Sequence, residues 1–284
     1  MNEASLTVED ARAALRQAQV TRVHDMAIES HGRRLPLRLY WPAGKGPFAV
    51  LVFFHGGGWV TGDLDTHDGF CRLMCDWAGC AVIAVDYARP PEHLFPAALD
   101  DCWTALQWVV RQGREHGLDT SRIAVAGGGS GGAMAAVICQ RDSAQQRPCL
   151  GFQLLLYPLL DCHTRYPSHE QFAQGHGLTT QMLEWYLGHY LPPGTSRADP
   201  RLSPLLDDAL HGLPRTLIIT SELDILRDEG RAYAARLRAA GVSVEHLEFK
   251  GMRHGFMNHP AAHDEARQAL LSCVRSLQAQ FRGE

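Results

Sequence analysis

The stretch "RIAVAGGGSGG" at residues 122–132 runs directly into "AMAAVICQR" at 133–141. Its first residues form a short apolar run bounded by a glycine cluster, which is typical of a buried strand. The residues that follow the serine have the small and apolar character of a helix packed closely on a sheet. So many glycines between the two elements indicate a sharp turn, where side chains would block a close approach of the backbone. The stretch therefore predicts a strand, a tight turn and a helix.

Other apolar runs repeat this pattern along the chain. Each run is short and continuous, as expected for strands buried on both faces of a parallel sheet. Helical patterns separate them, and the last one, over residues 266–281, keeps helical spacing throughout. Strands that alternate with helices predict an α/β fold, with a mostly parallel central sheet covered by helices on both faces. The runs are "FAVLVFF" (48–54), "CAVIAVDY" (80–87), "GFQLLLYP" (151–158), "RTLIIT" (215–220) and "SVEHLEFK" (243–250).

The spacing of these runs predicts one domain over residues 1–284, with one irregular insertion. About fifty residues separate "GFQLLLYPLLD" (151–161) from "RTLIIT" (215–220), which is long for an ordinary connection. This insertion contains the aromatic helix pattern "LTTQMLEWYLGHYL" at 178–191. We expect residues 163–212, together with residues 1–20, to form a helical cap.

Composition excludes several classes of protein. The chain of 284 residues has a formal net charge of −4, which does not suggest a nucleic-acid partner. No apolar stretch reaches the length of a membrane span, and the polar start lacks a signal-peptide core. The eight cysteines form no C-x-x-C pair, so we expect free thiols in a reducing cytoplasm. A homodimer is compatible with the sequence.

The glycine-rich turn contains G-x-S-x-G with Ser130 at its centre, which is the pattern of a nucleophile elbow. The same letters also satisfy the dinucleotide-binding pattern G-x-G-x-x-G through Gly127, Gly129 and Gly132. That second pattern needs an acidic residue about twenty positions further on, at the end of the next strand. The next strand ends near Asp161, which is too distant. The elbow, with Ser130 as nucleophile, is the interpretation that the spacing favours.

A serine nucleophile needs a histidine base and an acid that orients it, and in α/β-hydrolases these follow in the order serine, acid, histidine. Two acids, Glu222 and Asp224, leave the strand "RTLIIT". His254 lies in a glycine-flanked loop just after the last strand. The nearby pair of His259 and His263 has helical spacing but no accompanying carboxylate pattern, so we expect no metal site.

Four separated blocks resemble the hormone-sensitive lipase-like branch (bacterial family IV) of the α/β-hydrolases. They are "HGGGWVTGDLDTHD" from residue 55, "GGGSGG" for the family's GDSAGG, "DILRDEG" for its D-P-L-R-D-E and "HGFMN" for its histidine block. The third block selects Asp224 over Glu222. In this comparison Gly129 replaces the family's Asp and Gly131 replaces its Ala.

The resemblance implies an α/β-hydrolase fold with a helical cap, and a triad of Ser130, His254 and Asp224. It assigns the oxyanion hole to the backbone N–H groups of Gly57, Gly58 and Gly131, because glycines allow close approach to the developing negative charge.

His55 is expected to support this loop. The substrate pocket is expected to involve Trp59, Trp185, Tyr186 and Phe256.

The predicted activity is that of a serine carboxylesterase acting on small-molecule esters of short to medium chain length, through an acyl-enzyme and without metal or organic cofactor. Two alternatives remain open. Arylformamidases resemble the same branch and carry an H-G-G-x-W block. Ligand-binding proteins without turnover also use this fold, although they typically lose the histidine that is present here as His254.

Overall fold

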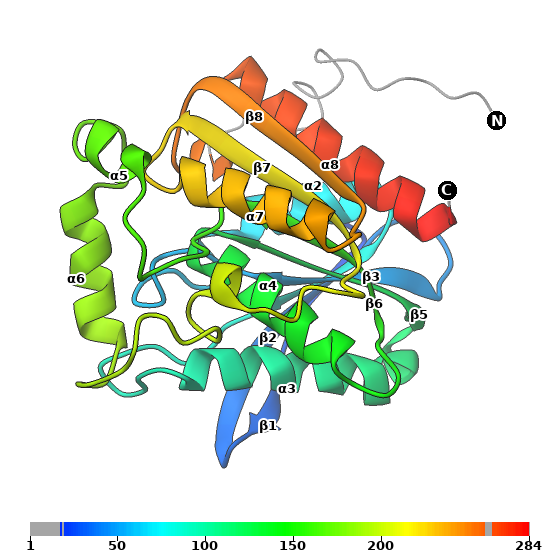
Figure 1. The fold of residues 1–284 in the computed structure, drawn as a ribbon. Helices are drawn as coiled ribbons and strands as arrows, with labels where there is room; N and C mark the ends of the chain where they lie inside the picture. The colour runs from blue at the N-terminus through cyan, green and yellow to red at the C-terminus, as the bar shows by residue number, and fades with distance from the viewer. Residues whose placement is uncertain (1–17, 19, 259–262, 284) are drawn as a thin grey trace.

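One sheet of eight strands forms the centre of the computed structural model, which describes residues 18, 20–258 and 263–283. Among these residues the strand order is β1-β2-β4-β3-β5-β6-β7-β8 (Figure 1). β1 pairs antiparallel with β2, and β2 with β4, whereas every later pair is parallel. The strands are β1 (Arg22–Ser30), β2 (Arg33–Trp41), β3 (Phe48–Phe54), β4 (Ala81–Val85), β5 (Leu118–Gly128), β6 (Leu150–Leu156), β7 (Arg215–Leu223) and β8 (Val244–Arg253).

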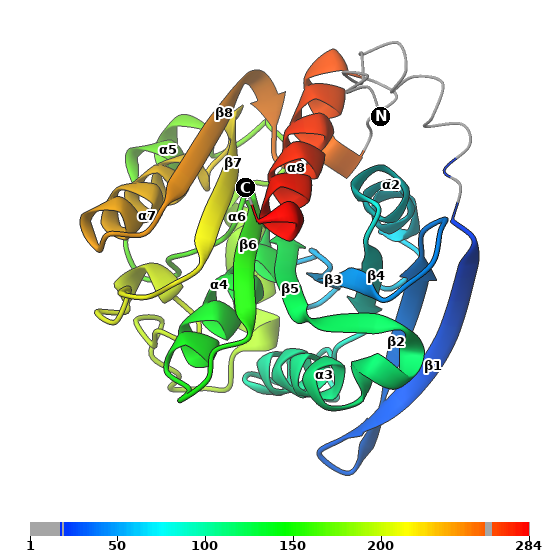
Figure 2. The ribbon, with the colours of Figure 1, turned by 90° about the vertical axis from the view of Figure 1, so that its right-hand side faces the viewer.

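The helices cover both faces of the sheet, as the sequence predicts. α2 and α8 lie on one face, and α3, α4 and α7 on the other (Figure 2). Central strands such as β4 are buried along their whole length because both faces are covered. These helices are α2 (Asp68–Ala78), α3 (Ala97–Gln112), α4 (Ser130–Ser143), α7 (Arg227–Ala239) and α8 (Asp264–Arg282).

The long insertion lies at one end of the sheet. Within residues 163–212 the chain forms α5 (Pro167–Gln171), α6 (Thr180–Tyr190) and the short 3-10 helix η2 (Pro204–Leu206). Figure 1 shows α5 and α6 stacked beside the sheet. Thr179 caps α6, because its side chain accepts the N–H of Met182. The other expected part of the cap, residues 1–20, falls almost entirely outside the described residues.

The carboxyl ends of four parallel strands bring the candidate residues to one edge of the sheet. β3 leads into His55, β5 into Gly129, β7 into Asp224 and β8 into His254. Open α/β sheets bind their ligands at this edge. None of the described helices is long and apolar enough to cross a membrane.

Candidate active site

The turn between β5 and α4 is centred on Gly129, one residue before the position that the sequence analysis favoured. Gly129 has φ 54° and ψ −116°, a backbone conformation that strains residues with a side chain. Its N–H donates to Leu156 O at 3.0 Å, and its own carbonyl accepts the N–H of Leu159 at 3.0 Å. Ser130 is instead the first residue of α4. The strained position of the elbow is therefore occupied by glycine.

His254 and Asp224 come together across the ends of β7 and β8. The distance from His254 Nδ1 to Asp224 Oδ2 is 2.7 Å, and Asp224 is fully buried. Because a carboxylate only accepts hydrogen bonds, Nδ1 carries a proton, and in the neutral imidazole Nε2 is then the nitrogen with the free lone pair. Glu222, the other candidate acid, accepts the N–H of Gly251 at 2.7 Å instead. Tyr157, with φ 36°, packs its ring edge-on against His254 at 4.9 Å between centroids.

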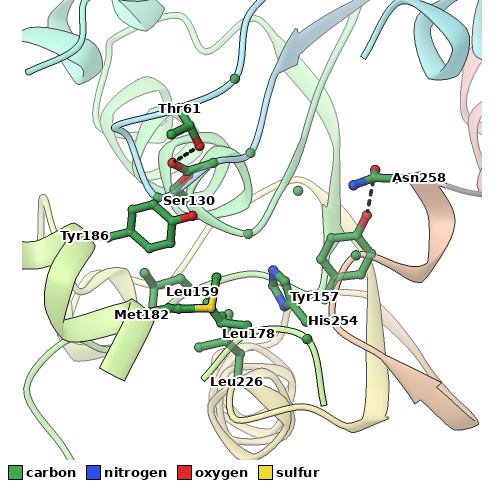
Figure 3. Close-up of a pocket in the computed structure, with 18 of the residues that line it drawn as sticks. Thr61, Ser130, Tyr157, Leu159, Leu178, Met182, Tyr186, Leu226, His254 and Asn258 are labelled. Atoms are coloured by element: carbon green, nitrogen blue, oxygen red, sulfur yellow. Dashed lines mark hydrogen bonds between the residues drawn. The ribbon is translucent and has the colours of Figure 1, made fainter. Parts of the chain in front are cut away.

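The free nitrogen of His254 faces Gly129 rather than the hydroxyl of Ser130. A Cβ placed on Gly129 would lie 3.3 Å from His254 Nε2. Ser130 Oγ accepts the backbone N–H of Trp59 at 3.2 Å, and no hydrogen bond joins Ser130 to His254 among the residues described. Figure 3 shows His254 next to Tyr157, with Ser130 drawn apart from it. This geometry corrects the expectation that Ser130 is the nucleophile of a triad.

The glycines of the "HGGGW" loop present two free amides. Gly57 has φ 121° and Gly58 has φ 60°, so both use conformations that favour glycine. Gly57 O accepts the N–H groups of Val60 and Thr61, which closes a tight turn. The described part of the chain supplies no acceptor for the N–H of Gly57 or Gly58. Both residues line the cavity described below, as an oxyanion hole requires.

Gly131 has a different surrounding from the one expected. It is not among the residues that line the cavity, and a Cβ on it would collide with the carbonyl oxygen of Phe54 at the end of β3. Glycine is therefore needed at residue 131 for the close packing of α4 on the sheet. Gly131 packs against β3 and does not line the cavity, which does not support the expectation that its N–H belongs to the oxyanion hole.

His55 supports the loop through hydrogen bonds of its ring and its backbone. Burial lowers the pKa of His55 to about 3, so the imidazole is neutral. Its Nδ1 donates to Gly56 O at 2.8 Å, and its carbonyl oxygen accepts the hydroxyl of Tyr87 at 2.8 Å. The Tyr87 ring also stacks on the imidazole, with centroids 4.1 Å apart.

The cap helix α6 touches the same loop through two tyrosines one turn apart. Tyr190 stacks on the indole of Trp59, with ring centroids 4.7 Å apart and an angle of 5° between the planes. A Cβ on Gly58 would collide with the ring of Tyr186, so this ring packs directly against the glycine.

Of the four aromatic residues expected in the pocket, the structure places only Tyr186 in the lining. Trp59 is buried against Tyr190. Trp185 lies on the outer side of α6 and is 49% exposed. Phe256 packs against Phe249. Their sequence neighbourhood suggested a pocket, but loop conformation and helix phase turn these three side chains elsewhere.

The cavity has a volume of about 420 Å³. Its lining includes Ser130, Gly129, His254 and the two loop glycines, together with apolar side chains from the insertion. Figure 3 shows Ser130, His254 and Met182 around it. Most of the apolar lining carries no signal in the sequence, because single leucines and methionines form no motif. The apolar lining residues are Leu159, Leu178, Met182, Leu183 and Leu226.

A metal site finds no support among the described residues, which contain no group of three or more His, Cys, Asp or Glu side chains able to hold an ion. His259, one of the pair considered above, lies outside them.

The family model that matches the chain describes the alpha/beta hydrolase fold and covers residues 51–258. The chain is 43% identical to carboxylic ester hydrolase LipN of Mycobacterium tuberculosis over 83% of its own length and 64% of LipN. It is 39% identical to carboxylesterase NlhH of the same species, over 96% of this chain and 90% of NlhH. The crystal structure of EstE1, a thermostable carboxylesterase cloned from a metagenomic library, matches with a TM-score of 0.90 and 34% identity, covering 96% of this chain and 94% of that one.

A sheet of this topology, with His254 and Asp224 at its carboxyl edge, defines an α/β-hydrolase. The chain belongs to this family, and its hormone-sensitive lipase-like resemblance is confirmed. It is a carboxylic ester hydrolase.

Proposed function

We propose that the cavity hydrolyses uncharged esters of short to medium acyl length, with His254 as general base and Asp224 orienting it. The observation that carries this proposal is the pairing of His254 and Asp224 at 2.7 Å, with Nε2 open to a cavity that Gly57 and Gly58 also line. A base and two free amides on one cavity are the parts needed to attack a carbonyl carbon and stabilise the oxyanion.

The substrate class follows from the lining of the cavity. Among the residues that the structure describes, no aspartate, glutamate, lysine or arginine lines the cavity, so a charged substrate group would lose its hydration without gaining a partner there. The apolar side chains from the cap suit an alkyl or aryl group. A volume of about 420 Å³ is at the small end of ligand sites, which favours short and medium chains.

Rates on nitrophenyl esters of graded acyl length test this proposal. We expect the highest kcat/KM at or below about eight carbons, and a decline beyond that length. Nitrophenyl butyrate should be hydrolysed much faster than the matched nitrophenyl hemisuccinate, whose acyl chain ends in a carboxylate. Met182→Ala should extend the range to longer chains, whereas Trp185→Ala, on the exposed side of the same helix, should not.

An aryl formamide in the same panel separates the two hydrolase activities that the sequence leaves open. Faster turnover of the formamide than of every ester would contradict the proposal. Hydrolysis that is no faster than that of His254→Ala would also contradict it.

A further inference from the structure

At the elbow, the position next to His254 that a nucleophilic side chain would occupy is held by Gly129. Gly129 holds the strained conformation between β5 and α4, and the nearest heavy atom to a Cβ at this position is His254 Nε2, at 3.3 Å. A side chain at residue 129 would therefore point at the base. Since glycine has none, Nε2 is reached directly from the cavity, which both residues line.

The hydroxyl of Ser130 is held in another direction. Its Oγ accepts the N–H of Trp59, and the Ser130 residue is only 2% exposed. Trp59 is itself fixed by its stack on Tyr190, so the amide that binds this hydroxyl belongs to a rigid part of the site. Ser130 is also the first residue of α4, which constrains its backbone.

We propose that water, and not Ser130, attacks the ester in this enzyme. This inference rests on the function proposed above. His254 Nε2 takes a proton from the water while its oxygen bonds to the carbonyl carbon, and the carbonyl electrons form an oxyanion at the Gly57 and Gly58 amides. The oxyanion then reforms the carbonyl and the bond to the alcohol breaks. The leaving alkoxide takes the proton from His254. One water and one ester yield one acid and one alcohol, with no acyl-enzyme.

This route predicts a slow enzyme with a distinctive kinetic signature. Serine proteases that have lost a triad member keep about 10³–10⁴-fold catalysis over water, through substrate binding and the oxyanion hole. Without a covalent intermediate, product release should show no initial burst. A fluorophosphonate should not become attached to the protein, because that reagent needs a nucleophilic side chain beside the base.

The decisive variant is Gly129→Ser, which supplies a hydroxyl next to His254. We expect kcat to rise by about 100-fold or more, and a fluorophosphonate to label residue 129, as identified by peptide mapping. Ser130→Ala in the wild-type background should lower kcat by no more than about fivefold, because it removes a hydroxyl that bonds the Trp59 amide and the Tyr87 side chain but not His254. His254→Ala should remove the activity of both the wild type and Gly129→Ser.

Two results would overturn the inference while leaving ester hydrolysis intact. One is fluorophosphonate labelling of Ser130 in the wild-type protein. The other is a loss of more than about 100-fold in kcat for Ser130→Ala that still shows a native circular dichroism spectrum. The Ser130 variant decides the matter even if Gly129→Ser does not fold. A wild-type rate equal to that of His254→Ala would instead overturn the proposed function together with the water mechanism.

Discussion

The indole of Trp59 lies face to face with the phenol ring of Tyr190, with ring centroids 4.7 Å apart and an angle of 5° between the planes. This contact joins the loop that carries Gly57 and Gly58 to the cap helix α6. Trp59 has φ 62°, which costs on the order of 1–3 kcal/mol in a residue with a side chain. A stacked aromatic pair contributes about 0.5–1.5 kcal/mol beyond its buried area, so Tyr190 offsets part of that strain. We therefore expect α6 to help fix the two amides that are proposed to stabilise the oxyanion.

Replacing Tyr190 by leucine should therefore impair catalysis more than binding. Because Tyr190 does not line the cavity, we expect Tyr190→Leu to lower kcat by about 10-fold or more and to change KM by less than about twofold. Tyr190→Phe keeps the ring and should retain most of the activity. Steady-state kinetics on one nitrophenyl ester would measure both.

Tyr233→Leu is the matched control, since Tyr233 is equally buried but lies on α7 near Gln140. It should lower the melting temperature without lowering kcat well below that temperature. If Tyr233→Leu and Tyr190→Leu reduce kcat equally, the effect is general destabilisation and the link from the cap to the loop is wrong.

A second prediction concerns Gly131, which the comparison of motifs set in the place of the family's Ala, so that an alanine there would be tolerated. The structure indicates the opposite, because a Cβ would meet the carbonyl oxygen of Phe54 and also that of His55, both of which are backbone atoms. Gly131→Ala should lower the melting temperature strongly or prevent folding, because β3 and α4 would have to separate.

Gly188→Ala provides the comparison, because Gly188 lies on α6 with no atom within 4 Å of a Cβ. This change should stabilise the protein by about 0.5–1 kcal/mol through helix propensity. Thermal unfolding of the two variants should move the midpoint in opposite directions. Similar midpoints would show that α4 and β3 can move apart at little cost.

The sequence predicted a mostly parallel sheet with helices on both faces, because apolar runs and helical periodicity follow directly from burial. It also predicted that Asp224 would meet His254 at one edge. It did not place the elbow correctly. "GGGSGG" and GDSAGG, compared letter by letter, set Gly129 opposite the serine, but the pattern G-x-S-x-G drew attention to Ser130. Either Ser130 or Gly129 could therefore occupy the position of the family's serine. The backbone angles of Gly129 show that it holds the strained position of the elbow, and such angles cannot be obtained from composition or spacing.

The directions of the aromatic side chains also could not be predicted from the sequence. Trp185 and Tyr186 are neighbours on α6, yet only Tyr186 points into the cavity, because successive helical residues differ by about 100° in direction. Trp59 is turned away from the cavity by its left-handed conformation, which no pattern of letters indicated.

The choice between the two acids gives a third prediction. Asp224→Asn should lower kcat by at least about 100-fold, because the asparagine NH2 group can donate to Nδ1, which puts the imidazole proton on Nε2 and removes the base. Glu222→Gln should lower it by less than about fivefold, since Glu222 binds the Gly251 amide and its glutamine replacement can still accept that bond. Kinetic constants at one pH, with circular dichroism as a check on folding, separate the two. The reverse order would mean that Glu222 orients the histidine.

Glu229 gives the last prediction, which concerns stability and pH. It is completely buried on α7, and its Oε2 accepts the N–H groups of Leu160 at 3.0 Å and Asp161 at 2.6 Å. Burial raises the pKa of Glu229 well above its usual value, so the folded protein keeps this carboxyl protonated where the unfolded chain has released the proton.

A carboxyl with a raised pKa in the folded state stabilises the fold fully below its unfolded pKa of about 4.3, and this stabilisation is lost as the pH rises towards the folded pKa. Glu229→Gln keeps an acceptor for the two amides and does not titrate. The melting temperature of Glu229→Gln relative to wild type should therefore increase as the pH rises from 5 to 8. The increase should be roughly 2 °C or more for each pH unit over which Glu229 is protonated in the folded wild type and ionised in the unfolded chain. Glu92→Gln, at an exposed glutamate, should show no such trend. A difference between Glu229→Gln and wild type that stays constant over this range would show that Glu229 is ionised in the folded protein.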